Sequence, residues 1–334
     1  MKKNQGFTLV ELLIGAVLSL IVFGGAISLF IASDEVTDST IQNGELQETG
    51  TYALNLLTKD IMMHGYLGLA TGEASTMQIH NNAAVSQDCT GEPGNNGTFP
   101  NASEFNFRTI FMITATGVDD YGCIPDAKAY STILQIKRGL GESVAEGEEE
   151  NTRYYIKSTP AGDVYFYAGN DQASLMPDAE RVSVMEYQNY IYYVREESQG
   201  DITVPILARY QLEKDATAAA SGGQLVSYDL VEGIEYINAL MGVDSDNDGV
   251  ANFYLPVSNM NDSREYWDES EQMTIVSAKL FVLARSIEPD HRVENNLSYD
   301  LGDRIYTPNG DKYRRMLFTN TVYIANKGLG WEIE

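Results

Sequence analysis

The sequence predicts an α+β protein in which one long N-terminal helix packs on a mainly antiparallel β-sheet body. Three observations predict this fold class. An apolar run over residues 7–32 continues into a polar, helix-compatible stretch that ends near Met63. Beyond residue 100, short β-branched or alternating runs recur, and clusters of Gly, Asn, Asp and Pro separate them. The 21 Tyr residues also favour strands over a helical bundle.

The first segment has the features of a membrane anchor. Lys2 and Lys3 precede the apolar run, which has 26 residues and one charge, Glu11. As a helix the run would be about 39 Å long, enough to span a hydrocarbon core of about 30 Å. The two lysines favour a cytoplasmic N-terminus. A secretory signal is shorter and ends at a small-residue cleavage site, so we expect the apolar helix to stay in the mature protein.

Glu11 distinguishes this segment from a plain membrane anchor. A charged side chain near the centre of a membrane helix costs about 2.5 to 3.5 kcal/mol and is rarely placed there without purpose. Residues 6–13, GFTLVELL, resemble the processing and assembly motif of type IV pilins and type II secretion pseudopilins. The resemblance implies that a prepilin peptidase cuts between Gly6 and Phe7 and methylates the new amine. It also implies that Glu11 pairs with the terminal amine of a neighbouring subunit during assembly.

The chemistry of cleavage agrees with that role. The nitrogen of Phe7 is a neutral amide before cleavage and an amine of ordinary pKa about 7.7 to 8.0 afterwards, so cleavage creates a positive charge. Glu11 lies one helical turn from this new N-terminus, where the helix dipole favours a carboxylate. Many major pilins have a bending proline later in the helix. This helix has no proline, and Gly24-Gly25 is the only obvious point of low helix propensity, where we expect any bend.

The chain divides into four expected parts: a leader over residues 1–6, the membrane or filament-core half of the helix over 7–33, its amphipathic half over 34–68, and a β-rich body over 69–334. Gly65 or Gly68 is suited to cap the helix. The apolar stripe that we expect to face the sheet is Ile41, Leu46, Tyr52, Ala53, Leu56, Leu57 and Ile61.

The predicted strands of the body are found between turn-forming clusters. They cover residues 109–114, 132–137, 153–157, 164–167, 182–194, 204–212, 226–240, 275–285 and 316–325. Residues 87–103 and 139–151 are predicted to be loops.

Several blocks outside the N-terminus resemble the PilW family of minor type IV pilins. They are residues 46–54 with the helix end at Gly65-Tyr66, residues 230–235 and 242–244, residues 283–286, and residues 313–315 with 318–319. The resemblance implies a minor pilin that initiates or assembles the pilus in a priming or tip complex. The implied partners are other minor and major pilins, the prepilin peptidase and the inner-membrane assembly platform. The implied location is the inner membrane, with a periplasmic body, and then the pilus.

The net charge limits which partners the protein can bind. Asp and Glu outnumber Lys and Arg by 48 to 22, giving a formal net charge of −26, so direct nucleic-acid binding is disfavoured.

The two cysteines, Cys89 and Cys123, lie in loop-like stretches, and export to an oxidising compartment would let them pair. Closing that loop would stabilise the fold by roughly 3 to 4 kcal/mol in the chain-entropy model.

An acidic segment over residues 244–250, DSDNDGV, is a candidate structural calcium site. Asp244, Asp246 and Asp248 stand at alternate positions before a glycine, and the carbonyl of Val250 would add a ligand. The position that carries a bidentate Glu in an EF-hand is Leu255, so Asn252, Asp262 or water would have to complete the shell. The alternative is an Asp-rich turn between strands.

The sequence does not predict an enzyme. It lacks a phosphate-binding glycine loop, a zinc-binding helix motif and a nucleophile elbow, and its three histidines are scattered. Two alternatives to the minor pilin stay open: a type II secretion minor pseudopilin, which shares the N-terminal motif, and a calcium-dependent adhesin carried on a pilin stalk. A membrane-tethered enzyme would need a pocket that the sequence does not display.

Overall fold

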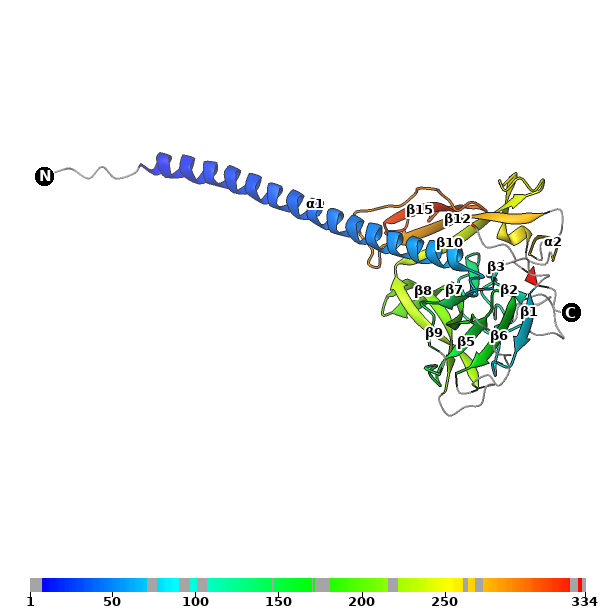
Figure 1. The fold of residues 1–334 in the computed structure, drawn as a ribbon. Helices are drawn as coiled ribbons and strands as arrows, with labels where there is room; N and C mark the ends of the chain where they lie inside the picture. The colour runs from blue at the N-terminus through cyan, green and yellow to red at the C-terminus, as the bar shows by residue number, and fades with distance from the viewer. Residues whose placement is uncertain are drawn as a thin grey trace. The chain divides into compact units, whose positions relative to one another are not determined.

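The computed structural model describes residues 8–70, 77–89, 97–100, 107–145, 147–169, 171, 181–215, 222–260, 264–267, 273–324 and 330–331. The chain divides into two compact units, Met1–Glu45 and Leu46–Glu334. One long helix and a mainly antiparallel β-body make up the described residues, as predicted (Figure 1).

Helix α1 covers Leu9–Met63 without interruption. It is the one described helix that is long and apolar enough to cross a membrane, and the apolar window is not buried by protein. The helix ends where it was predicted to end. Gly65 adopts a φ of +66°, which favours glycine, and its amide donates to the carbonyl of Lys137 at 3.0 Å.

The larger sheet contains eight strands. Its main path runs β1-β6-β5-β7-β4-β3, and β8 pairs with β7 and β9. The pairing of β1 with β6 is parallel, and the other named pairs in this sheet are antiparallel. The strands are β1 (Gln78–Asn81), β3 (Ile110–Thr114), β4 (Thr132–Leu140), β5 (Tyr154–Ser158), β6 (Asp163–Ala168), β7 (Ser183–Gln199), β8 (Ile202–Lys214) and β9 (Gly223–Glu232).

The smaller sheet has the order β11-β10-β12-β15 and is wholly antiparallel. Its strands are β10 (Ile234–Asp244), β11 (Phe253–Pro256), β12 (Thr274–Arg285) and β15 (Arg315–Tyr323). Two short pairs accompany the sheets: β13 (Tyr299–Asp300) with β14 (Ile305–Tyr306), and β2 (Phe107–Arg108) with β16 (Gly330–Trp331). The short helices are η2 (Val257–Asn259) and α2 (Arg264–Trp267).

The predicted single strand over residues 226–240 is wrong. The chain breaks at Gly233, so that β9 joins the larger sheet and β10 joins the smaller one. Gly233 has a φ of +87°, and a Cβ there would lie 3.0 Å from the carbonyl oxygen of Arg285. Only glycine fits this corner comfortably. The predicted loop over 139–151 also begins too early, because β4 extends to Leu140.

The part of α1 in the body packs against both sheets (Figure 1). Phe318 of β15 lies over Gly50, and Asp60 bonds Arg138 of β4. Ile41 and Tyr52, predicted on the apolar stripe, are exposed instead. The helix residues that are buried are Leu46, Gly50, Ala53, Leu57, Asp60 and Ile61, a spacing of three and four that marks one helix face.

Candidate functional site

The N-terminal end of α1 contains the predicted assembly residue. Gly6 and Phe7 lie outside the described residues, so the processing prediction is not tested. Glu11 lies in the first turn of α1 and forms a capping box with Thr8. The Thr8 amide and hydroxyl donate to Glu11 Oε2 at 2.9 and 2.8 Å, and the Glu11 amide donates to Thr8 Oγ1 at 3.3 Å.

This capping box gives the lone acid a partner within its own helix. Thr8 had no predicted role, although a Thr followed three residues later by Glu before an apolar run is the sequence signature of such a box. Assembly through Glu11 would therefore exchange hydrogen bonds from Thr8 for a charged partner. Both kinds of bond use the ionised carboxylate, and a cationic donor would add a Coulomb attraction that the neutral Thr8 groups lack.

The apolar part of α1 offers a continuous hydrophobic surface. Between Leu9 and Val36 the large apolar side chains are exposed all around the helix, with Leu9 at 76% and Phe30 at 73%. A helix that is apolar on every side requires lipid or other helices around it.

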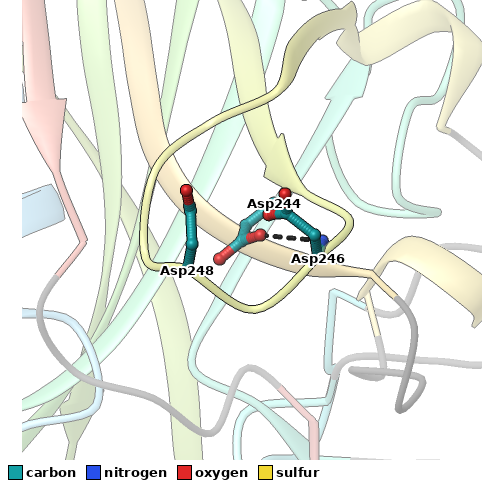
Figure 2. Close-up of side chains that lie close together, drawn as sticks. All are labelled: Asp244, Asp246 and Asp248. Carbon is teal, nitrogen blue, oxygen red and sulfur yellow. Dashed lines mark hydrogen bonds between the residues drawn. The ribbon is translucent and has the colours of Figure 1, made fainter.

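The acidic segment forms the turn between β10 and β11. Asp244 is the last residue of β10, and Figure 2 shows its side chain beside Asp246 and Asp248. Carboxylate oxygens of the three residues lie within 4.8 Å of one another. Asp244 accepts backbone amides of Asp246 at 3.1 Å, Asn247 at 2.8 Å and Gly249 at 2.7 Å. Burial disfavours its charge, yet these hydrogen bonds prevail and lower the pKa of Asp244.

The rest of the predicted calcium shell is not assembled around these acids. Asn252 Oδ1 accepts the amide and hydroxyl of Ser245 at 2.6 and 3.0 Å, and Leu255 of β11 pairs with Met241 of β10. The Val250 amide donates to Asp248 Oδ1 at 2.8 Å, and Asp262 lies outside the described residues. Calcium takes six to eight oxygen ligands, so water would have to supply several. The calcium site stays a prediction.

The two cysteines are joined. Cys89 and Cys123 form a disulfide with their Cα atoms 5.3 Å apart, across 34 residues of sequence. Beside it, Asp88 accepts the amide and hydroxyl of Thr98 at 2.7 and 2.6 Å. The structure describes residues 87–89 and 97–100 of the long loop predicted over 87–103. The disulfide and the hydrogen bonds between Asp88 and Thr98 hold these two parts in place.

Comparison with protein families adds to this geometry. A model of the prokaryotic N-terminal methylation motif matches residues 1–27, and a model described as type IV pilus-assembly protein W, PilW, matches residues 191–326. The chain is therefore similar to proteins with the N-terminal methylation motif at its start, and to the PilW family over residues 191–326. No curated protein and no solved structure matches the chain.

The PilW match runs from Ile191 in β7 past the end of β15, and so covers the smaller sheet. One end of this sheet holds an ion cluster in which the side chains of Glu235, Arg285 and Arg315 are buried. Glu235 pairs with Arg315 at 2.5 Å and with Arg285 at 3.7 Å, and Arg315 also reaches Asp311 at 2.6 Å. These residues stand in or beside the PilW-like sequence blocks. The cluster links β10, β12 and β15, so in this chain those blocks form a structural core.

Proposed function

We propose that the protein is a minor type IV pilin that takes part in initiating pilus assembly, within a priming or tip complex. Prepilin peptidase would process it after Gly6. Its partners would be other minor and major pilins and the inner-membrane assembly platform. It would reside in the inner membrane with a periplasmic body and then in the pilus. The proposed role is structural, with no catalysis by the chain itself.

The observation that carries this proposal is the presence of both family matches on one chain. The methylation motif covers the first part of the apolar segment of α1, up to residue 27, and the PilW match covers the β-body from within β7 to residue 326. A membrane-anchored pilin accounts for both parts. The large body favours a position at the tip, because a bulky domain would pack poorly along a tight filament.

The proposal gives Glu11 a specific step. In the membrane the carboxylate would keep its hydrogen bonds from Thr8. Cleavage would create a positive amine at Phe7 of each subunit. A neighbouring amine could then replace Thr8 as the partner of Glu11 and set the register between helices.

A deletion strain tests the role. We expect loss of surface filaments and of twitching motility, restored by the wild-type gene and not by Glu11→Ala. Glu35→Ala is the matched control, because Glu35 is an exposed acid on the same helix, and it should restore both. Mass spectrometry of the membrane-bound protein should find a chain that begins at methylated Phe7. Normal filaments in the deletion strain would refute the assembly role.

The N-terminal motif is common to minor pilins and type II secretion pseudopilins and cannot distinguish them. The phenotype of the same deletion strain can. Loss of protein secretion with filaments intact would assign the chain to a type II secretion system.

Calcium binding at Asp244, Asp246 and Asp248 is a further part of the proposal. The proximity of the three carboxylates supports it, because repulsion among them would be relieved by a cation. Bound calcium would order the β10–β11 turn. In a calcium-dependent adhesin, the ordered turn would then contact a surface.

A further inference from the structure

A pocket of about 470 Å³ lies beside the disulfide-linked loop, far in sequence from the N-terminal motif. The loop, residues 115–131, joins β3 to β4 and is called here the Cys123 loop. It contributes one wall of the pocket, and Glu196 of β7 and Tyr236 of β10 contribute the other. The pocket therefore opens where the Cys123 loop meets strands of both sheets.

The Cys123 loop is held rigidly. Besides the disulfide, the carboxylate of Asp120 accepts the amide and hydroxyl of Thr116 and the amide of Gly117, at 2.8 to 3.1 Å. The amide of Lys128 donates to the carbonyl of Val194 in β7 at 2.7 Å. A wall fixed in this way loses little freedom when a ligand binds.

Tyr130 combines a strained backbone with an exposed side chain. Its φ is +67°, which is unusual for a bulky residue. Backbone contacts maintain this conformation: the Tyr130 amide donates to the carbonyl of Ala115 at 2.8 Å, and its carbonyl accepts Nδ2 of Asn238 at 3.2 Å. The side chain is 63% exposed at the pocket. Strain of this kind tends to occur at functional sites.

The charges around the pocket limit what it can bind. Lys128 pairs with Glu196 at 2.6 Å, while the exposed Asp126 adds a second acid. Together with the net charge of −26, this disfavours an anionic ligand. A cationic ligand is disfavoured as well, because Lys128 and Arg304 already lie over the ring of Tyr236, at 4.4 and 4.5 Å.

With anionic and cationic ligands disfavoured, a neutral ligand rich in hydroxyl groups fits the pocket best. Hydroxyls both donate and accept, so they can bond to the carboxylates of Asp126 and Glu196 and to the ammonium of Lys128. The Arg304 guanidinium lies 5.0 Å from the centroid of the Tyr130 ring, and the apolar C–H face of a sugar ring can pack on the part of this ring that is exposed. A few placed polar groups beside aromatic surface are typical of small-molecule sites.

We propose that this pocket binds a neutral saccharide. The proposal goes beyond the assembly role and does not depend on it, since the pocket lies wholly within the body. It is also separate from the calcium turn.

The test uses the full-length protein in nanodiscs free of glycoside detergents. Methyl β-galactoside, methyl α-mannoside and N-acetylglucosamine are the neutral probes in saturation-transfer NMR and titration calorimetry. N-acetylneuraminic acid and choline are the anionic and cationic probes. We expect at least one neutral sugar to bind and neither charged probe to compete with it.

Tyr130→Gly is the informative variant, because it removes the ring at a backbone conformation that glycine prefers and should fold normally. We expect it to weaken sugar binding about tenfold or more, equivalent to about 1.4 kcal/mol. Tyr323→Ala is the control, since Tyr323 is 60% exposed on β15, and its binding should be unchanged. Absence of binding by all three neutral sugars, tighter binding of a charged probe, or full binding by Tyr130→Gly would each overturn the proposal. Normal filaments in the Tyr130→Gly strain would show that the pocket and assembly are separate.

Discussion

Asp60 is a buried carboxylate on α1, with 2% of its surface exposed. It accepts a hydrogen bond from Arg138 at 2.6 Å and another from the hydroxyl of Tyr192. Asp60→Ala would leave the guanidinium of Arg138 largely buried without its carboxylate. We expect the free energy of unfolding to fall by about 3 kcal/mol or more, as measured by urea denaturation.

An exposed pair gives the control for Asp60. Arg195 and Asp229 are joined at 2.7 Å, but the side chain of Asp229 is 48% exposed. Asp229→Ala should therefore cost about 0 to 1 kcal/mol. Equal losses in the two variants would show that Asp60 does not join the helix to the larger sheet as described.

His64 should make stability depend on pH. Burial lowers its pKa from 6.5 to about 4, and its Nδ1 lies 3.0 Å from Oγ1 of Thr109. Below pH 6.5 the unfolded chain binds a proton that the folded chain does not. The His64 contribution is thus complete above pH 6.5 and is lost as pH falls towards 4, by about 3 kcal/mol in total.

The His64→Gln variant isolates this effect. The amide of the introduced glutamine could still bond Thr109 but would not titrate. We expect the difference in unfolding free energy between wild type and variant to change steadily between about pH 7 and about pH 4.5. A difference that is independent of pH would contradict the assignment to His64.

Sequence motifs are recognisable where the chemistry is local, and the roles of Gly6, Phe7 and Glu11 stay predictions. The spacing of Gly6, Phe7 and Glu11 lies within one short segment, and the methylation-motif match covers it. The network of Asp60 with Arg138 and Tyr192 could not be predicted, because its members are 78 and 132 residues apart in sequence. Only the folded sheet brings them together.

At the scale of elements, Gly50 controls how closely α1 packs on β15. A Cβ at Gly50 would lie 2.0 Å from Cε2 of Phe318. Gly50→Ala should destabilise the body by about 1 to 3 kcal/mol, because the ring must move. Gly44→Ala, on the same helix with nothing within 4 Å, should instead stabilise the helix by up to about 1 kcal/mol.

A double substitution distinguishes crowding from other causes. Phe318→Leu removes the ring that meets position 50, so the loss from Gly50→Ala should be much smaller in the Phe318→Leu background. Thermal unfolding of the four proteins in this cycle measures the coupling. Additive losses would show that the contact does not limit packing.

The elements themselves were mostly predictable. Eight of the nine predicted runs correspond to single observed strands, because alternation and turn residues mark them. The ninth was predicted as one strand over 226–240, because apolar and polar residues keep alternating across the change of sheet. Gly233 was the available signal, but a glycine in a strand also marks a bulge. The short strands β1, β13 and β14 are too brief to show a pattern.

For the whole molecule, the dominant property is the net charge of −26. Self-repulsion at this charge opposes the compact state. Raising the salt concentration from about 10 to about 150 mM shortens the screening length from about 30 to about 8 Å, and should stabilise the fold without any specific site.

The sugar pocket could not be predicted from the sequence, because the Cys123 loop, Glu196 and Tyr236 meet only in the folded body.

Calcium binding must be separated from this general screening. At matched ionic strength, Ca²⁺ should raise the unfolding free energy more than Mg²⁺, by about 2.7 kcal/mol when its concentration is about one hundred times the dissociation constant. Asp246→Asn combined with Asp248→Asn should abolish the difference between the ions. The control removes two exposed acids elsewhere, with Asp201→Asn and Glu288→Gln, and should keep it. If Ca²⁺ and Mg²⁺ act equally on the wild type, the three carboxylates serve only the turn, whose backbone hydrogen bonds to Asp244 already hold it closed.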